Sequence, residues 1–162
     1  MSTQQMHASL LPRLSLPHEG GWSILELCGG ERPRRIVVTH PDPRQQALAQ
    51  TLVEAWSHGA FGAHARVMRT GTSESIDSVT DAMLFHIAKS PDQLRVLREL
   101  RIGSVLIVRM DSEGHAIGSV TFVGPRWGHA FDGRDRVLAE DLAMGAALAI
   151  ISADGAEATT GR

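Results

Sequence analysis

The sequence is poor in cysteine and in long apolar runs, and each shortage excludes a class of protein. Cys28 is the only cysteine in 162 residues, so the chain cannot form an internal disulfide or a cysteine-rich zinc site. No apolar run approaches the roughly 20 residues that cross a bilayer. The N-terminus lacks the basic and then apolar layout of a secretory signal. We therefore expect a cytoplasmic protein.

The sequence also lacks an excess of charge of one sign. Its formal net charge is −2, and acidic and basic residues are interspersed, so no field of the whole chain attracts nucleic acid or an anionic membrane. The hydrophobic fraction of 43% and the charged fraction of 21% are typical of a globular protein and exclude general disorder. We expect one folded domain that binds neither nucleic acid nor membrane.

Two pairs of predicted strands are each joined by a short polar turn. Residues 22–28 alternate between the two sides of a strand, and residues 34–40 are rich in β-branched residues. Residues 104–110 are apolar enough for a central strand, and residues 115–124 are its predicted hairpin partner. The connecting stretches are GGERP and DSEG. Strands joined in this way run antiparallel.

Helix-capping residues mark four predicted helices. The predicted N-caps are Asp42, Thr80 or Asp81, Ser90 and Asp132, and both Pro43 and Pro91 suit a first helical position. The first of these helices is predicted to end at Gly59. Residues 65–71 and 74–79 are predicted to be short strands or extended loop around a turn at Gly71.

This order of elements predicts an α+β fold with a central antiparallel sheet of five or six strands and helices on both faces. We divide the chain into a leader with a short helix over residues 1–20, a domain over 21–152, and a flexible tail over 153–162.

Five segments in this order resemble a GAF domain of the kind that accompanies PAS domains, sensor histidine kinases and serine phosphatases in bacteria. They read VVTHPDP, ARVMRTGTSESIDSVTDAML, SPDQLRVLRELRIGSVLIV, GHAIGSVTFV and FDGRDRVLAEDLAMGAALAI. The resemblance covers roughly Trp22 to Ile151 without large gaps. One departure is Arg109, which follows the SVLIV strand where those relatives often have proline.

The resemblance implies a small-molecule pocket on one sheet face, roofed by the middle segment and the paired helices. By position, the implied ligand-binding residues are Arg66, Met68, Ser75, Asp77, Leu84, His86, Leu97, Ile107 and Arg109. Arginines at these positions could hold an anionic ligand bidentately, or they could be solvated. The apolar residues among them could equally be plain core.

Specialised uses of GAF domains make demands that this sequence does not meet. Methionine sulfoxide reductases of this fold need a cysteine relay, which Cys28 alone cannot supply. Bilin photoreceptors surround their chromophore with tyrosine and histidine, and the chain has no tyrosine. The signature of cyclic-nucleotide-binding GAF domains is missing as well. We therefore assign no cofactor.

Haem is the alternative cofactor, because eight histidines are present and His86 lies near the implied pocket. No two histidines have metal-ligand spacing on a helix, so we interpret His86 as a surface residue. A small enzyme that uses His86 or Asp77 is a further alternative. Near Asp77, however, Glu74 and Asp81 fit turn and capping chemistry better than acid–base catalysis.

The last predicted helix is apolar around more of its circumference than one sheet face can bury. Its second apolar side offers Val137, Met144, Leu148 and Ile151, of which 137, 144 and 151 are seven residues apart, a spacing that suits a partner helix. We therefore predict a homodimer through this side, with coverage by the N-terminal helix of the same chain as the alternative.

Together, these features predict a non-catalytic sensory domain in bacterial signal transduction that relays ligand state through its terminal helices. The expected output is a histidine kinase or phosphatase domain, in cis or in trans. The alternative is a dimerisation scaffold that binds no ligand.

Overall fold

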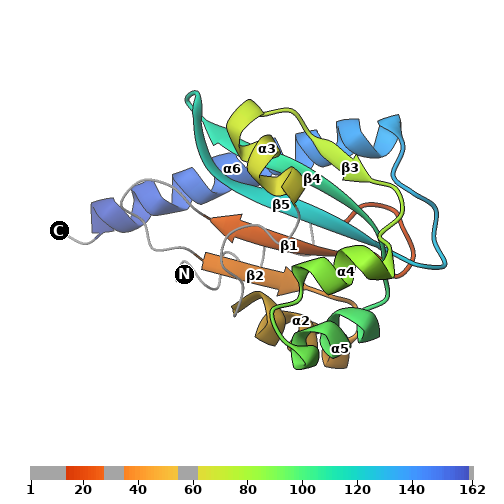
Figure 1. The fold of residues 1–162 in the computed structure, drawn as a ribbon. Helices are drawn as coiled ribbons and strands as arrows, with labels where there is room; N and C mark the ends of the chain where they lie inside the picture. Colours follow the sequence, from red (N-terminus) through yellow and green to blue (C-terminus); the bar gives the residue numbers. More distant parts are fainter. Residues whose placement is uncertain (1–13, 28–34, 55–61, 161–162) are drawn as a thin grey trace.

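The computed structural model describes residues 14–27, 35–54 and 62–160. Within them, five strands form an antiparallel sheet in the order β2-β1-β5-β4-β3. Helices α2 to α5 lie on one face of the sheet, and the long helix α6 lies on the other (Figure 1). The predicted α+β fold class is confirmed.

All four predicted strands of the two pairs are present, and a short edge strand completes the sheet. The strands are β1 (Trp22–Leu27), β2 (Arg35–Thr39), β3 (Glu74–Ile76), β4 (Ile102–Ser112) and β5 (His115–Pro125). Between β4 and β5 the two turn residues, Glu113 and Gly114, both have positive φ, at 51° and 80°. This backbone is typical of the two-residue turn whose twist matches that of a β-hairpin.

The helices α2 (Pro43–Glu54), α4 (Asp81–Ile87) and α5 (Pro91–Glu99) begin at the predicted caps. The carboxylate of Asp42 accepts a hydrogen bond from the backbone of Arg44, and the hydroxyl groups of Thr80 and Ser90 accept equivalent bonds in their own helices. Each cap satisfies an N–H group that has no partner within its helix. The predicted end of the first helix at Gly59 lies outside the described residues.

The prediction for residues 65–71 was wrong, because they lie in and just after helix α3 (Gly62–Thr70). Ala63 and Val67 are buried at a helical spacing of four, but this repeat covers a single turn. One turn is too short a window for periodicity to reveal a helix. The turn at Gly71 is present, with φ of 75°, directly after the helix.

The sheet is buried on both faces. On β4, Val105 and Ile107 pack against helices α2 to α5, whereas Leu106 and Val108 pack on the side of α6. This alternation follows from the period of two in a strand.

Helix α6 (Gly133–Thr160) is longer than predicted. It begins with the predicted cap, because Asp132 and Asp135 each accept a hydrogen bond from the backbone N–H of the other. The same N–H of Asp135 holds the pKa of Asp132 below its usual value. Residues 153–160 are helical where we expected a flexible tail, since their alanines favour a helix and Gly155 does not end it. No helix in the described part of the chain is long and apolar enough to span a membrane.

The folded unit also reaches into the segment that we assigned to a leader. Leu14 and Leu16 are buried in the core on the α6 side of the sheet. The helix expected in the leader falls mainly on residues 1–13, which lie outside the described residues.

Candidate functional site

A polar row crosses three neighbouring strands beneath α3. Ser119 of β5 lies directly between Glu26 of β1 and Arg109 of β4 in the register of the sheet. Glu26 and Ser119 are buried, at 6% and 1% exposure. Buried carboxylates are costly unless they are paired, so the row needs partners from the covering helix.

His64 of α3 supplies one of these partners. Its Nε2 lies 2.9 Å from the hydroxyl of Ser119 and 3.5 Å from the carboxylate of Glu26. Both contacts use the same ring nitrogen, whereas in a Ser-His-acid triad the acid holds the opposite nitrogen. The arrangement therefore fixes α3 on the sheet and does not resemble the site of a serine hydrolase.

Arg109 attaches the other end of α3 to the sheet. Its guanidinium donates to both carboxylate oxygens of Asp111, at 2.7 and 3.2 Å, and to the carbonyl of Met68, at 3.0 Å. A Cβ on Gly71 would lie 2.6 Å from Nη2 of Arg109, so glycine leaves room for this contact. Cations at a helix C-terminus are stabilising. Arg109 thus completes the end of α3 instead of pointing freely into solvent.

Ion pairs on the outer surface join the helices α3, α4 and α5, which cover this face of the sheet, to one another or to the edge strand β3. We call these four elements the roof. Arg66 of α3 contacts Glu74 of β3 through two nitrogens, at 2.9 and 3.1 Å. Arg98 of α5 donates to both oxygens of Asp81 of α4, each at 2.9 Å, and this contact lowers the pKa of Asp81. These pairs are largely exposed and contribute little stability, and they connect α3 to β3 and α4 to α5.

The predicted ligand-binding residues are spread over the core and the surface of this roof. Leu84, Leu97 and Ile107 lie together in one core with almost no exposed surface. Ser75, Asp77 and His86 are exposed. Their role in ligand binding stays a prediction. No group of three histidine, cysteine or acidic side chains within the described ranges could hold a metal ion.

Sequence reasoning missed the Glu26–His64–Ser119 cluster. One signal was present, because Glu26 alternates with Trp22 and Ile24 and therefore places an acid on an apolar strand face. Nothing in the sequence paired that acid with His64, which lies 38 positions further along.

The loop from α3 to β3 contacts α6 directly. The hydroxyl of Ser73 donates to the carboxylate of Glu140, at 2.8 Å, and the guanidinium of Arg136 donates to the carbonyl of Ser73. Ser73 is 3% exposed. Since β3 is an edge strand, this loop passes around the edge of the sheet from the α3 face to the α6 face (Figure 1). It is a physical link between the roof and the C-terminal helix.

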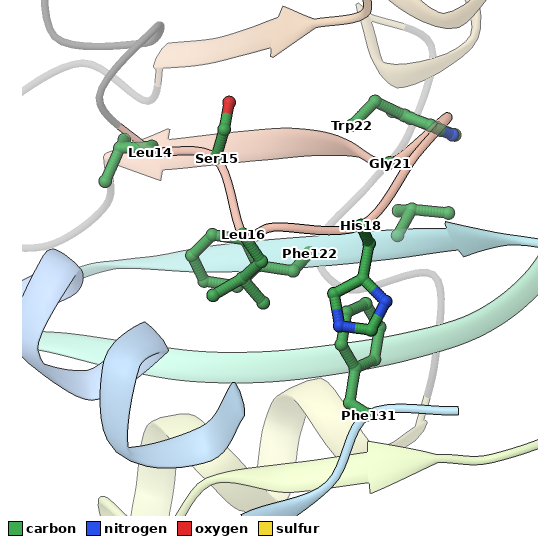
Figure 2. A pocket seen from close by; sticks show the side chains of 9 residues that line it. Leu14, Ser15, Leu16, His18, Gly21, Trp22, Phe122 and Phe131 are labelled. Atoms are coloured by element: carbon green, nitrogen blue, oxygen red, sulfur yellow. The ribbon is translucent and has the colours of Figure 1, made fainter. Parts of the chain in front are cut away.

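The segment before β1 also contacts α6. The Nε2–H of His18 donates to the carboxylate of Asp135, at 2.9 Å, and the two rings of His18 and Phe131 lie 5.0 Å apart. Figure 2 shows the His18 side chain directed toward Phe131, with Leu16 beside Phe122. The cavity between them is only about 10 Å³, so the packing is close to complete. The N-terminal segment and the start of α6 therefore form one packed unit.

Helix α6 has two faces of different character. Toward the sheet it buries mostly small side chains, namely Ala139, Ala143, Ala146, Ala147 and Ile150. On the outside Val137, Met144 and Leu148 are 61%, 63% and 64% exposed, and Ile151 is half-buried. Within the described part of the chain, three of the four residues of the apolar stripe predicted as a dimer interface are therefore largely uncovered.

Comparison with solved structures supports a relationship in fold. No protein-family model matches the sequence, and the search of curated proteins gave no significant match. A domain assigned to a two-component sensor histidine kinase of Sinorhizobium meliloti is similar over 100% of this chain and 99% of its own length, with a TM-score of 0.63 and 16% identity. The GAF domain/HD domain protein of Geobacter sulfurreducens is similar over 93% of both chains, with a TM-score of 0.64 and 15% identity. The chain has the GAF fold.

The GAF domain of a sensor histidine kinase from Bacillus halodurans is also similar, with a TM-score of 0.55 and 13% identity over 95% of this chain and 97% of that one. The resemblance to the GAF fold drawn from the sequence segments is thus confirmed. At these identities the similarity extends to the fold alone.

Proposed function

We propose that this chain is a non-catalytic sensory domain of the GAF type that relays ligand state through its terminal helices. The single observation that carries the proposal is the contact of Ser73 with Arg136 and Glu140. The three-residue loop Gly71–Ser73 directly follows α3. Because Ser73 contacts α6, this loop connects α3 to the C-terminal helix.

The mechanism is a shift of population between two packings of α3 on the sheet. A ligand changes the balance only if it binds one packing better than the other. Val67 of α3 and Val105 of the sheet have no exposed surface, so a ligand must move α3 to enter between them. When α3 moves, Ser73 is displaced with it, and the contacts of Ser73 with Arg136 and Glu140 transmit the displacement to α6.

The displacement of α6 acts on a second copy of the chain, whose α6 packs against it. Val137, Met144, Leu148 and Ile151 form an apolar stripe along α6, and their spacing fits pairing with an identical helix. The segment before β1 packs against the start of the same helix through His18, so it is in direct contact with the element that forms the proposed interface. A histidine kinase or phosphatase domain, in cis or in trans, is the proposed output. Two of the structural neighbours come from sensor histidine kinases, which agrees with this choice.

We assign no cofactor. His86 is exposed on α4, and its exposure supports the interpretation as a surface histidine over a haem ligand.

A thermal-shift screen against nucleotides, amino acids and aromatic acids tests whether the domain senses a ligand. A ligand at about 100 times its Kd stabilises by about 2.7 kcal/mol, which raises Tm by roughly 5–10 °C in a chain of this size. Hydrogen exchange then tests the relay. The ligand changes amide exchange in α6 of the wild type and much less in Ser73→Ala, while Thr72→Ala, an exposed neighbour in the same loop, behaves like the wild type.

Two results contradict this proposal. The absence of any stabilising ligand favours a scaffold that only dimerises. An equal response of α6 in Ser73→Ala and in the wild type shows that the loop does not carry the signal.

A further inference from the structure

A concave site lies at the other end of β1 and β5 from the Glu26–Ser119 row. It is a cleft of about 730 Å³, a volume in the range of small-molecule sites. Its walls come from the segment before β1, the start of α2, the end of α5, and Pro125 and Trp127 at the end of β5. It is separate from the face beneath α3, so the inference drawn from it does not depend on the proposed relay.

Aromatic rings form one side of this cleft. Trp127 is 66% exposed, and its indole lies against Gly20, since a Cβ on Gly20 would be 3.0 Å from Cζ2 of Trp127. The rings of Trp22 and His40 lie 5.4 Å apart at the base of the same cleft. A supported but exposed indole beside a concave site is suited to stacking with a planar group.

His40 presents a neutral ring to the cleft. Burial lowers the pKa of His40 below its usual value of 6.5. Its Nδ1 accepts a hydrogen bond from the backbone N–H of Asp42, at 2.9 Å, so the proton of the neutral ring is on Nε2. His40 therefore adds a hydrogen-bond donor and no charge.

Charges of both signs lie beside each other at the end of α5. Glu99 and Arg101 are exposed, line the cleft, and flank the buried Leu100. Neither side chain forms an ion pair within the described residues. Arg101 also has φ of 50°, in the left-handed region where glycine is the usual residue. The chain thus carries a long cationic side chain at a position where the backbone favours glycine.

We propose that this cleft binds a small zwitterion that carries an aromatic ring, such as an aromatic amino acid or a short peptide that contains one. The ring stacks on Trp127, the carboxylate pairs with Arg101, and the ammonium group pairs with Glu99. An aromatic anion would leave the carboxylate of Glu99 without a counter-charge and would lie in the same cleft as the carboxylate of Asp42. An aromatic cation would leave the guanidinium of Arg101 without a counter-charge and would be repelled by it. A zwitterion satisfies both charges at once.

Tryptophan fluorescence and calorimetry test this inference with four probes on the full chain. L-Phenylalanine and glycyl-phenylalanine carry both charges, 3-phenylpropionate lacks the ammonium group, and 2-phenylethylamine lacks the carboxylate. We expect saturable binding of at least one zwitterion, and at least tenfold weaker binding of the two analogues. The tighter of the two zwitterions tells whether the ligand is an amino acid or a peptide.

Two variants and two matched controls assign the binding to the cleft. Trp127→Ala removes the stacking surface, and Arg101→Gly removes the cation while allowing the same backbone conformation. Each should weaken binding at least tenfold. Glu113→Gly changes the other left-handed non-glycine residue, at the far end of β4, and Phe85→Ala removes an exposed aromatic on α4. Both controls should bind within twofold of the wild type.

Three results overturn the inference: neither zwitterion binds saturably, one analogue binds as tightly as the zwitterions, or Trp127→Ala and Arg101→Gly bind like the wild type. The proposed relay is not affected by any of them, because its test uses Ser73 and α6.

Discussion

The hydroxyl of Ser73 donates a hydrogen bond to the carboxylate of Glu140, 67 residues further along the chain, at 2.8 Å. Ser73 precedes the edge strand β3, and Glu140 lies on the helix that covers the opposite face from α3. Arg136 reinforces the contact by donating to the Ser73 carbonyl and lies 4.0 Å from Glu140. Two layers that the sheet separates are therefore connected around its edge.

Ser73→Ala should lower stability by about 1 kcal/mol, because it removes a hydrogen bond to a charged but half-exposed acceptor. Tm should fall by roughly 2–4 °C. A double-mutant cycle with Glu140→Ala, which removes the acceptor, measures the coupling of the two side chains by thermal unfolding. Fully additive effects of the two substitutions would show that they do not interact.

Asp141→Leu should strengthen the proposed dimer. Residues 137, 141, 144, 148 and 151 follow the alternating steps of four and three of a coiled-coil seam, and Asp141 is the charged member. Its replacement by leucine should lower the dimer Kd at least tenfold in sedimentation experiments. Asp92→Leu, on the exposed surface of α5, is the control and should leave the Kd unchanged. Equal behaviour of the two variants would place Asp141 outside the interface.

Stability should fall as the pH decreases through the usual histidine range, in part because of His40. Burial lowers the folded-state pKa of His40 below 6.5, so the unfolded chain binds its proton at higher pH than the folded chain does. The contribution of His40 to stability is therefore complete above about pH 7 and decreases as the pH falls through 6.5. It reaches a constant lower level once the folded-state pKa is passed.

His40→Asn should weaken this pH dependence, since asparagine can still accept the hydrogen bond from Asp42 but does not titrate in this range. Thermal unfolding of both proteins between pH 8 and 5 measures the difference. Identical slopes for the variant and the wild type would mean that His40 is not the group responsible.

Arg101→Gly and Glu113→Gly should each leave stability unchanged or raise it by up to about 1 kcal/mol. Both residues have φ near 50°, where side chains with a Cβ are strained, but glycine also increases the entropy of the unfolded chain. Chemical denaturation measures both variants. A clear loss of stability in Arg101→Gly alone would show that the arginine side chain stabilises the fold.

The strands, the helix caps and the long C-terminal helix could be predicted because each depends on neighbouring residues. Asp42, Ser90 and Asp132 cap helices through contacts with residues two or three positions away. Helix α3 could not be predicted, because its buried residues Ala63 and Val67 repeat only once and its stability depends on the sheet beneath it.

The polar contacts that define the candidate site could not be predicted from the sequence. His64 meets Ser119 across 55 residues, and Ser73 meets Glu140 across 67. These pairs form only when whole helices and strands pack together. The residues around each partner in the sequence therefore give no sign of the pairing. The apolar stripe of α6 could be predicted because it depends only on the spacing of residues within one helix. In the structure Val137, Met144 and Leu148 lie on the side of α6 that faces away from the sheet, and they are exposed.

Sedimentation equilibrium of the wild type and of Met144→Lys tests the central claim most directly. Phe85→Lys, which changes an equally exposed apolar residue on α4, is the control. The account predicts a dimer for the wild type and for Phe85→Lys, and a monomer for Met144→Lys. A monomeric wild type, or a dimer that Met144→Lys leaves intact, would contradict it.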